Sequence, residues 1–408
     1  MPPINGIIAE YNPLHKGHAY QLSECKKKTS AAYTVIVMSG NYVQRGEPAI
    51  IDKQIRTELA LRSGADLVLE LPVFYSCSSS RYFAEGAVDL MNKSGIITHL
   101  CFGSESGNLD ELCSFASLLN HETEYFKTAL NKHLSNGHSY PAARALAWGD
   151  ISQGKSTLNP ALPNNILAVE YIAALSRTKS RITPVTITRS GSGYHTPTST
   201  SGEFSSATAL RHLLLNRNFS KAASHVPKEA SESFLTYLEH APLITIDDYS
   251  AILSYLLSFV PDGIHDFPAY LWQRIKKRRN EFTTISSFIS DIKSRNITYT
   301  SISRSLLHWM LGLTSDMFQT FYKGQINPYI RILGFRKDSQ PLLRMLKEHA
   351  KVPIITKAAD YQKVLSSSPE AVTFFEKSRN CDDLYYRMQS IKKGEPAKCE
   401  LTRKLIIL

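Results

Sequence analysis

The stretch Ile7-Ile8-Ala9-Glu10-Tyr11-Asn12-Pro13-Leu14-His15-Lys16-Gly17-His18 decides how the first part of this chain folds. An apolar strand runs here into a proline-bearing turn and then into His-x-Gly-His. The glycine lets the backbone approach an anion, because no Cβ holds the anion away. A helix that begins at this turn directs its N–H groups and the positive end of its dipole at the same anion. The turn therefore predicts a nucleotide site in which His15 and His18 face a triphosphate. The alternative is that the two histidines only cap or pack the helix.

Strand-like and helix-like segments alternate through the first half of the chain. Apolar segments typical of strands occur at residues 4–10, 33–38, 66–71, 98–102 and 183–188. Segments with helical character lie between them, at residues 18–28, 53–63, 81–94 and 166–175. Strands separated by helices indicate βαβ units and a parallel sheet. We therefore predict an α/β fold, with a Rossmann-like, parallel-sheet catalytic domain over residues 1–212.

The pattern changes beyond this domain. Residues 213–408 are mainly helical in character, with longer spacers and many basic residues. An apolar element at 328–335 and a strand at 352–356 suggest a small α/β lobe near the C-terminus. We predict a mainly helical, basic C-terminal region with such a lobe.

Distinctive polar sequences follow the predicted strands. Residues 10–18 follow the first strand, 39–48 the second and 103–105 the fourth, and Arg189 ends the fifth. Because ligands of open α/β sheets bind at the carboxyl ends of the strands, these segments are expected to meet. Gly103 would let the backbone approach an adenine or ribose, although it could be a simple turn glycine. Residues 39–48 could hold a second substrate.

A second candidate phosphate site lies at residues 205–211, where hydroxyl side chains open a helix. Ser206 and Thr208 lie at the helix start, and Arg211 follows about a turn and a half later, an arrangement suited to clamp a triphosphate. The alternative is ordinary capping, since Ser and Thr are favoured at helix N-termini.

Composition excludes several classes of protein. The 408 residues are 43% hydrophobic and 20% charged, as in an ordinary globular protein. There is no apolar run of the roughly 18 residues expected for a membrane span. The first predicted strand leaves no room for a cleaved signal, so we expect a cytoplasmic protein without a membrane partner. The six cysteines form no Cys-x-x-Cys pattern, so no metal site is predicted from them.

The positive charge favours a polyanionic partner. The net charge is +11, and basic residues gather in the helical region around Lys276, Lys277, Arg278 and Arg279. Trp272, Tyr299 and Trp309 lie among the basic residues of this region. Basic residues contact phosphates and aromatic rings stack on exposed bases, so the region suits RNA. The alternative is a solvated helix face with core tryptophans.

These motifs carry a family resemblance. The His-x-Gly-His turn and residues 205–211 resemble the two phosphate motifs of the nucleotidylyltransferase (HUP) superfamily. More closely, the chain resembles the bacterial tRNA(Met) cytidine acetate ligases. The resemblance rests on ordered blocks at residues 10–18, 38–40, 44–49, 64–72, 102–105, 139–143, 163–167 and 328–334. One departure is Asn12, where the superfamily usually has Asp.

The resemblance implies an activity and its residues. Acetate and ATP would form acetyl-adenylate and release pyrophosphate, and the acetyl group would pass to N4 of the wobble cytidine of elongator tRNA(Met). The implied partners are that tRNA and acetate, with no DNA, and Mg²⁺ is expected to accompany ATP. His15 and His18 would be catalytic, while Lys16 is expected to face solvent. The resemblance implies ATP binding by Ile8, Ala9, Glu10, Tyr11, Asn12, Pro13, Leu14, His15, Lys16, Gly17, His18, Ala19, Tyr20, Gln21, Gly103, Asn164 and Arg189.

Two other functions fit parts of the sequence. One is a nucleotidylyltransferase for a small metabolite, which would have little use for the basic helical region. The other is a non-catalytic RNA-binding protein with a vestigial nucleotide site, against which the intact His15, Gly17 and His18 weigh.

Overall fold

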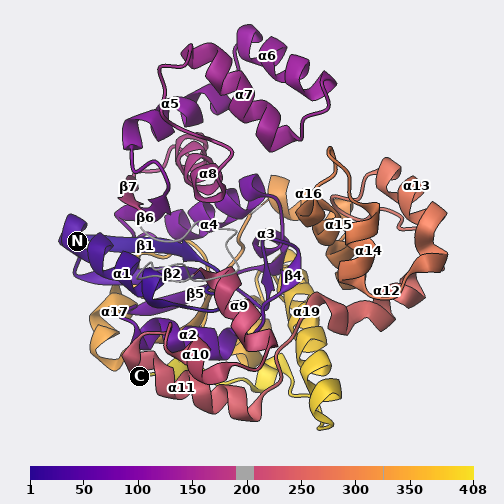
Figure 1. The fold of residues 1–408 in the computed structure, drawn as a ribbon. Coiled ribbons are helices and arrows are strands. Elements are labelled where there is room, and N and C mark those ends of the chain that lie inside the picture. Colours follow the sequence, from indigo (N-terminus) through magenta and orange to yellow (C-terminus); the bar gives the residue numbers. More distant parts are fainter. Residues whose placement is uncertain (190–205, 325) are drawn as a thin grey trace.

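The fold is built on one mixed sheet with helices on both faces (Figure 1). The computed structural model describes residues 1–189, 206–324 and 326–408. Eight strands within these ranges form the sheet, in the order β10-β8-β5-β2-β1-β6-β7, with β9 paired to β8. Five strands are mutually parallel: β1 (Ile4–Ala9), β2 (Tyr33–Ser39), β5 (Leu67–Leu71), β6 (His99–Ser104) and β7 (Thr183–Thr188). The predicted parallel α/β sheet is confirmed.

Residues along β2 alternate between two hydrophobic cores. Val35 and Val37 face the core that includes α4 (Ser80–Ser94) and α8 (Pro163–Arg177). Ile36 and Met38 face the second core, which includes α1 (Lys16–Thr29) and α2 (Lys53–Arg62). A strand buried on both faces reads as a continuous apolar run, which is why Tyr33–Ser39 shows no polar alternation.

The C-terminal strands correct one prediction. The element predicted at 328–335 is β8 (Ile330–Phe335), and it pairs antiparallel with β5. β9 (Ile354–Ile355) and β10 (Ile406–Ile407) pair parallel with β8. These strands therefore extend the main sheet, and the expected small α/β lobe is not a separate unit. β8 covers the edge of the fully buried β5, which would otherwise expose unpaired backbone groups.

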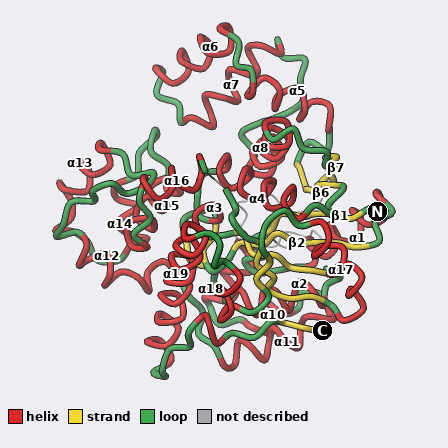
Figure 2. Tube along the Cα trace, turned by 180° about the vertical axis from the view of Figure 1, so that it is seen from behind, coloured by secondary structure: helices red, strands yellow, loops and turns green. Residues whose placement is uncertain are grey.

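Two groups of helices project from the sheet layer, at the top and the right of Figure 1. The upper group comprises α5 (Leu109–Asn120), α6 (Glu124–Ser135) and α7 (Tyr140–Ser152). The second, here called the lateral helical group, comprises α12 (Ser250–Leu256), α13 (Ala269–Arg278), α14 (Ile285–Ile292), α15 (Tyr299–Leu311) and α16 (Ser315–Lys323). Seen from behind, the two groups remain separate from each other (Figure 2). No helix in the described ranges is long and apolar enough to cross a membrane.

Further helices close the molecule around the sheet. Short elements follow β2, namely the β3 (Tyr42–Val43) and β4 (Glu47–Pro48) hairpin, and α3 (Val73–Ser76) follows β5. α9 (Ala207–Leu215), α10 (Phe219–Ala223) and α11 (Lys228–His240) cover the α2 side, while α17 (Gln340–His349), α18 (Tyr361–Val364) and α19 (Pro369–Lys393) follow the β8 strand. Phe374 of α19 stacks on Phe74 of α3, with ring centroids 4.7 Å apart.

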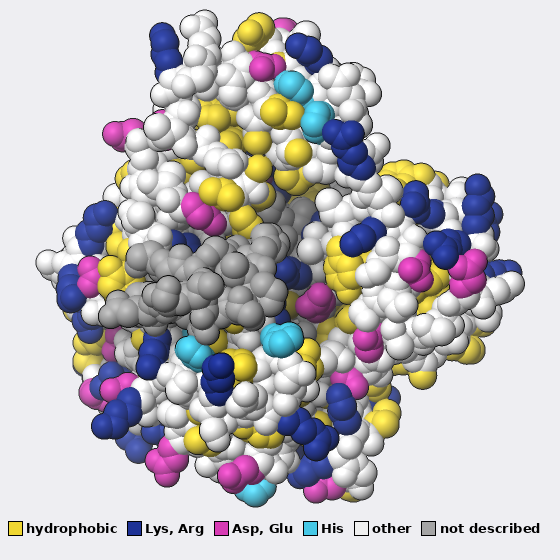
Figure 3. Space-filling model, in the orientation of Figure 1, with side chains coloured by type: hydrophobic (Ala, Val, Ile, Leu, Met, Phe, Trp, Pro, Cys, Tyr) yellow, Lys and Arg dark blue, Asp and Glu magenta, His cyan; other side chains and the backbone are white. Residues whose placement is uncertain are grey.

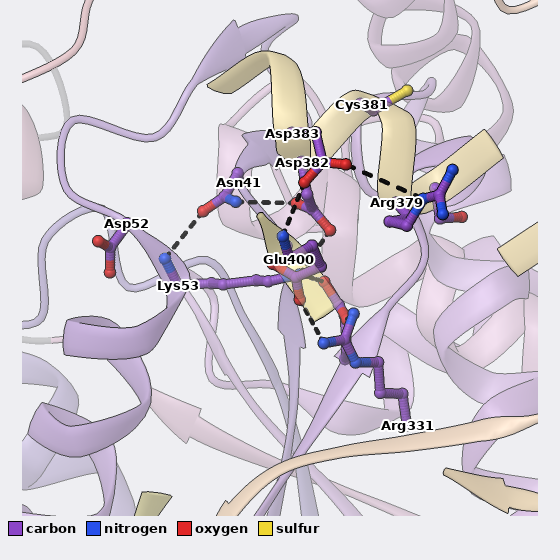
Figure 4. Close-up of polar contacts among 12 residues, drawn as sticks. Asn41, Asp52, Lys53, Arg331, Arg379, Cys381, Asp382, Asp383 and Glu400 are labelled. Atoms are coloured by element: carbon purple, nitrogen blue, oxygen red, sulfur yellow. Dashed lines mark hydrogen bonds and ion pairs between the residues drawn. The ribbon is translucent and has the colours of Figure 1, made fainter. Parts of the chain in front are cut away.

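A buried ionic cluster fastens α19 and the C-terminal segment to α2 and the sheet (Figure 4). The Lys53 ammonium lies 2.6 Å from a Glu70 oxygen, 2.5 Å from Asp382 and 3.0 Å from Glu400. Arg331 pairs with Glu70 at 3.0 Å and with Glu400. Burial raises the pKa of Asp382 above its usual range, although the charge of Lys53 opposes this. Two cations thus bind three carboxylates, and Lys53 occupies the position between the acids.

Candidate nucleotide-binding site

His15 and His18 together cap the N-terminus of α1. His15 is the N-cap residue, and its Nδ1 accepts a hydrogen bond from the Gly17 N–H at 3.1 Å. The His15 N–H in turn donates to Nδ1 of His18 at 3.3 Å, which completes a capping box. The alternative that the two histidines cap the helix is therefore confirmed. It does not exclude ligand binding, because both residues also line a cavity.

The capping geometry fixes the protonation of both rings. A neutral imidazole whose Nδ1 accepts a hydrogen bond carries its proton on Nε2. Burial, together with the charges of Arg189 and His225, lowers the pKa of His15 to about 3. Burial, with the charges of His15 and Arg189, also lowers the pKa of His18 well below its ordinary value. At neutral pH both rings are thus uncharged, and each has an Nε2–H group left to donate.

The turn before α1 is held by contacts to three distant segments. The Asn12 side chain accepts a hydrogen bond from the Ile50 N–H at 2.8 Å, and its backbone carbonyl accepts one from Arg211 at 2.8 Å. The buried Arg56 donates to the Glu10 carbonyl at 2.7 Å. These bonds give the turn a fixed shape, so that the histidines are positioned before any ligand binds.

Strand ends β6 and β7 meet next to this turn, as predicted. Arg189 follows β7, and its N–H donates to the Ser104 carbonyl at 3.0 Å. A Cβ at Gly103 would lie 3.2 Å from Cγ of Arg189, so a side chain there would crowd the arginine. Asn164, at the start of α8, donates twice to Glu105, at 2.6 and 3.1 Å. The neighbouring Asn165 is buried; its N–H also donates to the Glu105 carboxylate, at 2.7 Å, and its side-chain oxygen accepts from the Glu105 N–H.

The candidate phosphate clamp, residues 206–211, contacts the same turn through Arg211. Ser206 caps α9, since its hydroxyl accepts from the Ala209 N–H at 3.2 Å. Arg211 donates to the Thr208 hydroxyl at 3.0 Å as well as to Asn12. The clamp residues therefore reach the same turn as the histidines, and Ser206 has the capping role that the alternative proposed.

One cavity of about 150 Å³ brings most of the predicted site residues together. Its lining includes Ile8, Ala9, Glu10, Tyr11, Asn12, His15, His18, Gln21, Gly103, Asn164, Arg189, Ser206, Thr208 and Arg211. Six residues of the predicted turn are not in this lining: Pro13, Leu14, Lys16, Gly17, Ala19 and Tyr20. Leu14 is buried in the α1 core and Lys16 is exposed, as expected for the latter.

Six lining residues were not among the individually predicted site residues: Arg45, Phe83, Phe102, Leu167, Tyr171 and Ala207. Arg45 comes from the segment 39–48, while Phe83, Leu167 and Tyr171 come from the helices α4 and α8. The apolar side chains of Phe83, Leu167 and Tyr171 cannot be distinguished in sequence from core residues, because both kinds occur at helical spacing. A larger cavity, of about 640 Å³, lies between α2, α11 and α19 and contains none of the predicted nucleotide-site residues.

The predicted RNA-contact residues lie on the lateral helical group, where Figure 3 shows basic side chains with acidic ones among them. Lys276, Lys277 and Arg279 are exposed, and Arg278 pairs with Glu281. The aromatic part of the prediction is wrong for Trp309, which is 6% exposed and packs edge-on against the half-buried Trp272.

The fold and this site define a class of protein. The sequence pattern of the HIGH Nucleotidyl Transferase family matches residues 3–398, which include both helical groups and every strand of the sheet described above except β10. The histidine-capped turn at the head of α1 is thus part of a nucleotidyl transferase.

Individual relatives narrow the class. The tRNA(Met) cytidine acetate ligase of Thermoanaerobacter sp. (strain X514) is 38% identical over 396 residues, which cover 95% of this chain and 96% of that protein. The Acetivibrio thermocellus protein of the same name is 37% identical over 418 residues, covering 99% of each. Thermotoga maritima TmcAL, in its apo crystal form I, superposes with a TM-score of 0.91 at 29% identity, covering 100% of this chain and 99% of that one. The structure of Thermotoga maritima TmcAL bound with alpha-thio ATP superposes with a TM-score of 0.89. The chain belongs to the tRNA(Met) cytidine acetate ligase family.

Proposed function

We propose that this protein is an ATP-dependent ligase that acetylates a tRNA. It activates acetate as acetyl-adenylate, releases pyrophosphate, and transfers the acetyl group to N4 of the wobble cytidine of elongator tRNA(Met). The product is N4-acetylcytidine. The observation that carries the proposal is the pair of neutral histidines at the head of α1, facing a cavity that three arginines also line. The ATP-bound relative and the names of the other relatives support it.

The adenylation step needs donors rather than a base. A carboxylate such as acetate is ionised at neutral pH, so no proton has to be removed before it attacks the α-phosphorus. Negative charge accumulates on the phosphate oxygens, and fixed donors that strengthen there lower the barrier. The Nε2–H groups of His15 and His18 supply such donors without being charged. Arg45, Arg189 and Arg211 would offset the repulsion between acetate and the triphosphate.

The remaining predicted residues would position ATP. We assign Gly103, Asn164 and Arg189 to the nucleoside end, because they converge where β6 and β7 end. We assign Ser206, Thr208 and Arg211 to the phosphates. Mg²⁺ would accompany the triphosphate. Because the described part of the cavity lining contains a single carboxylate, phosphate oxygens and water would supply most of the ligands of the ion. Such an ion would screen the charge of the phosphates.

The transfer step requires a reactive acyl donor. The N4 amine of cytosine is a weak nucleophile, and the mixed anhydride makes its attack feasible. A site sheltered from water protects this anhydride from hydrolysis. An anticodon base is single-stranded, so it can be turned out of its stack and inserted into a pocket. The exposed basic side chains Lys276, Lys277 and Arg279 would hold the phosphates of the tRNA.

A direct assay tests the whole reaction. The purified protein is incubated with ATP, labelled acetate and unmodified elongator tRNA(Met), and the digested RNA is separated into nucleosides. The proposal expects ATP-dependent label in N4-acetylcytidine. Pyrophosphate release with acetate but without label in the RNA would mean a different acceptor. If the assay showed no pyrophosphate release and no label in the RNA, the result would favour a nucleotidylyltransferase for a small metabolite.

A further inference from the structure

Glu10 lines this cavity as predicted, but its negative charge needs a reason. It is the one carboxylate among the described residues that line the cavity, beside the three arginines Arg45, Arg189 and Arg211. Both anionic substrates, ATP and acetate, would be repelled by it, because like charges at close range disfavour binding. We therefore look for a role of the Glu10 carboxylate outside the adenylation step.

The position of the Glu10 carboxylate is fixed. One of its oxygens accepts a hydrogen bond from the Gln44 N–H at 2.8 Å. The backbone carbonyl of Glu10 accepts from the buried Arg56 at 2.7 Å. Within the described ranges, the second carboxylate oxygen makes no hydrogen bond. Glu10 thus presents a preorganised acceptor, with one oxygen anchored and one available.

Aromatic side chains line the cavity together with this acceptor. Phe83, Phe102 and Tyr171 line the same cavity. The rings of Phe102 and Tyr171 lie with their centroids 5.9 Å apart. Burial, followed by the charge of Glu10, raises the pKa of the Tyr171 hydroxyl. A carboxylate beside aromatic faces has the chemistry that recognises cytosine, since Glu accepts from the N4 amine and the ring stacks.

We propose that Glu10 binds the N4 amine of the acceptor cytidine and removes its proton during acetyl transfer. This role rests on the proposed function. The N4 nitrogen attacks the carbonyl carbon of acetyl-adenylate and forms the new C–N bond. The bond between that carbon and the phosphate oxygen breaks, and AMP leaves with the electron pair. One N4 proton passes to the Glu10 carboxylate, so that the neutral amide is released.

The anchor of Glu10 also connects it to the lateral helical group. Gln44 belongs to the β3–β4 hairpin, and the Gly46 carbonyl of that hairpin accepts a hydrogen bond from the Ser303 hydroxyl of α15 at 2.8 Å. The loop that fixes the acceptor carboxylate therefore rests on the helices proposed to bind tRNA. The β3–β4 hairpin would thus connect the binding of the tRNA to the residue that activates its cytidine.

The test separates the two half-reactions in the full-length protein with Glu10→Gln. Glutamine retains an oxygen for the Gln44 N–H but takes no proton. Adenylation is read as acetate-dependent exchange of labelled pyrophosphate into ATP, and transfer as single-turnover acetylation of elongator tRNA(Met). Glu10 belongs to the turn expected to bind ATP, so exchange can fall as well, but we expect it to fall much less than transfer. Transfer should fall by about 100-fold or more.

Further variants keep the result interpretable. Hydroxylamine, a strong nucleophile, should still capture acetyl-adenylate as acetohydroxamate in Glu10→Gln. Glu10→Asp, which keeps a carboxylate, should regain part of the transfer rate. Glu24→Gln is the matched control, because Glu24 lies outside the cavity lining and pairs with Lys27 on the surface of α1.

Three outcomes would overturn the role. Unchanged transfer in Glu10→Gln would show that no proton passes to Glu10. A parallel loss of exchange and transfer, in a protein that still melts like the wild type, would assign Glu10 to ATP or its metal. If the wild type itself showed neither exchange nor transfer, the proposed function would fail together with the role of Glu10.

Discussion

The imidazole rings of His15 and His18 stack with their centroids 3.8 Å apart, and each ring caps one backbone N–H group at the head of α1. The two Nδ1 atoms are thereby committed to the helix, which leaves the two Nε2–H groups for the phosphates in the proposed reaction. The capping role and the proposed phosphate role are compatible, because an imidazole has two nitrogens with separate roles.

The first prediction concerns His18→Ala. Loss of its Nε2–H donor should reduce acetyl-adenylate formation by about 100-fold or more, since a transition-state donor of this kind is worth that much. The affinity for tRNA should stay within a few-fold of the wild type. Pyrophosphate exchange and a binding titration measure the two effects. Lys27→Ala, an exposed change on the same helix, is the control. Wild-type turnover in His18→Ala would remove the catalytic assignment.

The second prediction concerns pH and stability. The pKa of His15 is about 3 in the folded protein against 6.5 ordinarily, so the unfolded chain binds more protons between these pH values. Stability is therefore lost as pH falls from about 6.5 toward 3, by about 1.4 kcal/mol per pH unit from this group. His15→Asn keeps a good N-cap but does not titrate. Urea unfolding at pH 7 and 5 should show a smaller pH loss in the variant; an equal loss would contradict the assignment.

A third prediction addresses the RNA surface. Reversing the charge of the exposed Lys276 and Lys277 to Glu should weaken tRNA binding and flatten its salt dependence. Removing one contact to a phosphate reduces the steepness of log K against log salt by about 0.7 to 0.9. Binding measured at several salt concentrations gives this slope. The same change at the exposed Lys347 and Lys351, which lie outside the lateral helical group, should have little effect. If both pairs behave alike, the RNA surface is elsewhere.

Gly46 allows a matched test of the contact between the β3–β4 hairpin and α15. Its φ is +79°, and an added Cβ would lie 2.3 Å from the Arg304 backbone nitrogen. Gly154 has a similar φ of +71°, but an added Cβ there would meet open space. Gly154→Ala should cost about 1 kcal/mol of stability from backbone strain alone. Gly46→Ala should cost more and should slow acetyl transfer more than adenylation. Equal behaviour of the two variants in unfolding and in both half-reactions would argue against the contact.

The fifth prediction concerns the buried ionic cluster. Lys53→Met would leave Glu70, Asp382 and Glu400 with Arg331 as their remaining cation in the cluster. Removal of one partner from a buried ion pair typically costs about 3 to 5 kcal/mol, because the charge left behind stays unsolvated. Denaturant unfolding measures the loss. Adding Glu70→Gln to Lys53→Met should recover part of it; a double variant as unstable as the sum of the single changes would indicate that these groups do not interact.

The sequence predicted the elements of the site better than its chemistry. Local patterns identified β1, the turn, α1 and the strand ends, because apolar periodicity and capping residues act within a few positions of the chain. The same patterns could not identify Phe83 or Tyr171 as cavity residues. Whether an aromatic residue packs in a core or lines a cavity depends on what lies opposite, and neighbours in sequence do not determine that. The burial of Trp309 against Trp272 has the same cause.

By itself, the sequence determined the parallel α/β class, the histidine turn and the family resemblance, all of which depend on short-range pattern and residue order. The tertiary structure alone decided the long-range pairings. β8 joins β5 across more than half of the chain, Arg211 reaches Asn12, and Gln44 fixes the carboxylate of Glu10. An apolar strand can pair with any exposed edge, and a side-chain donor can serve any nearby acceptor. The completed packing selects one partner for each, because alternative pairings would leave buried backbone or charged groups unsatisfied.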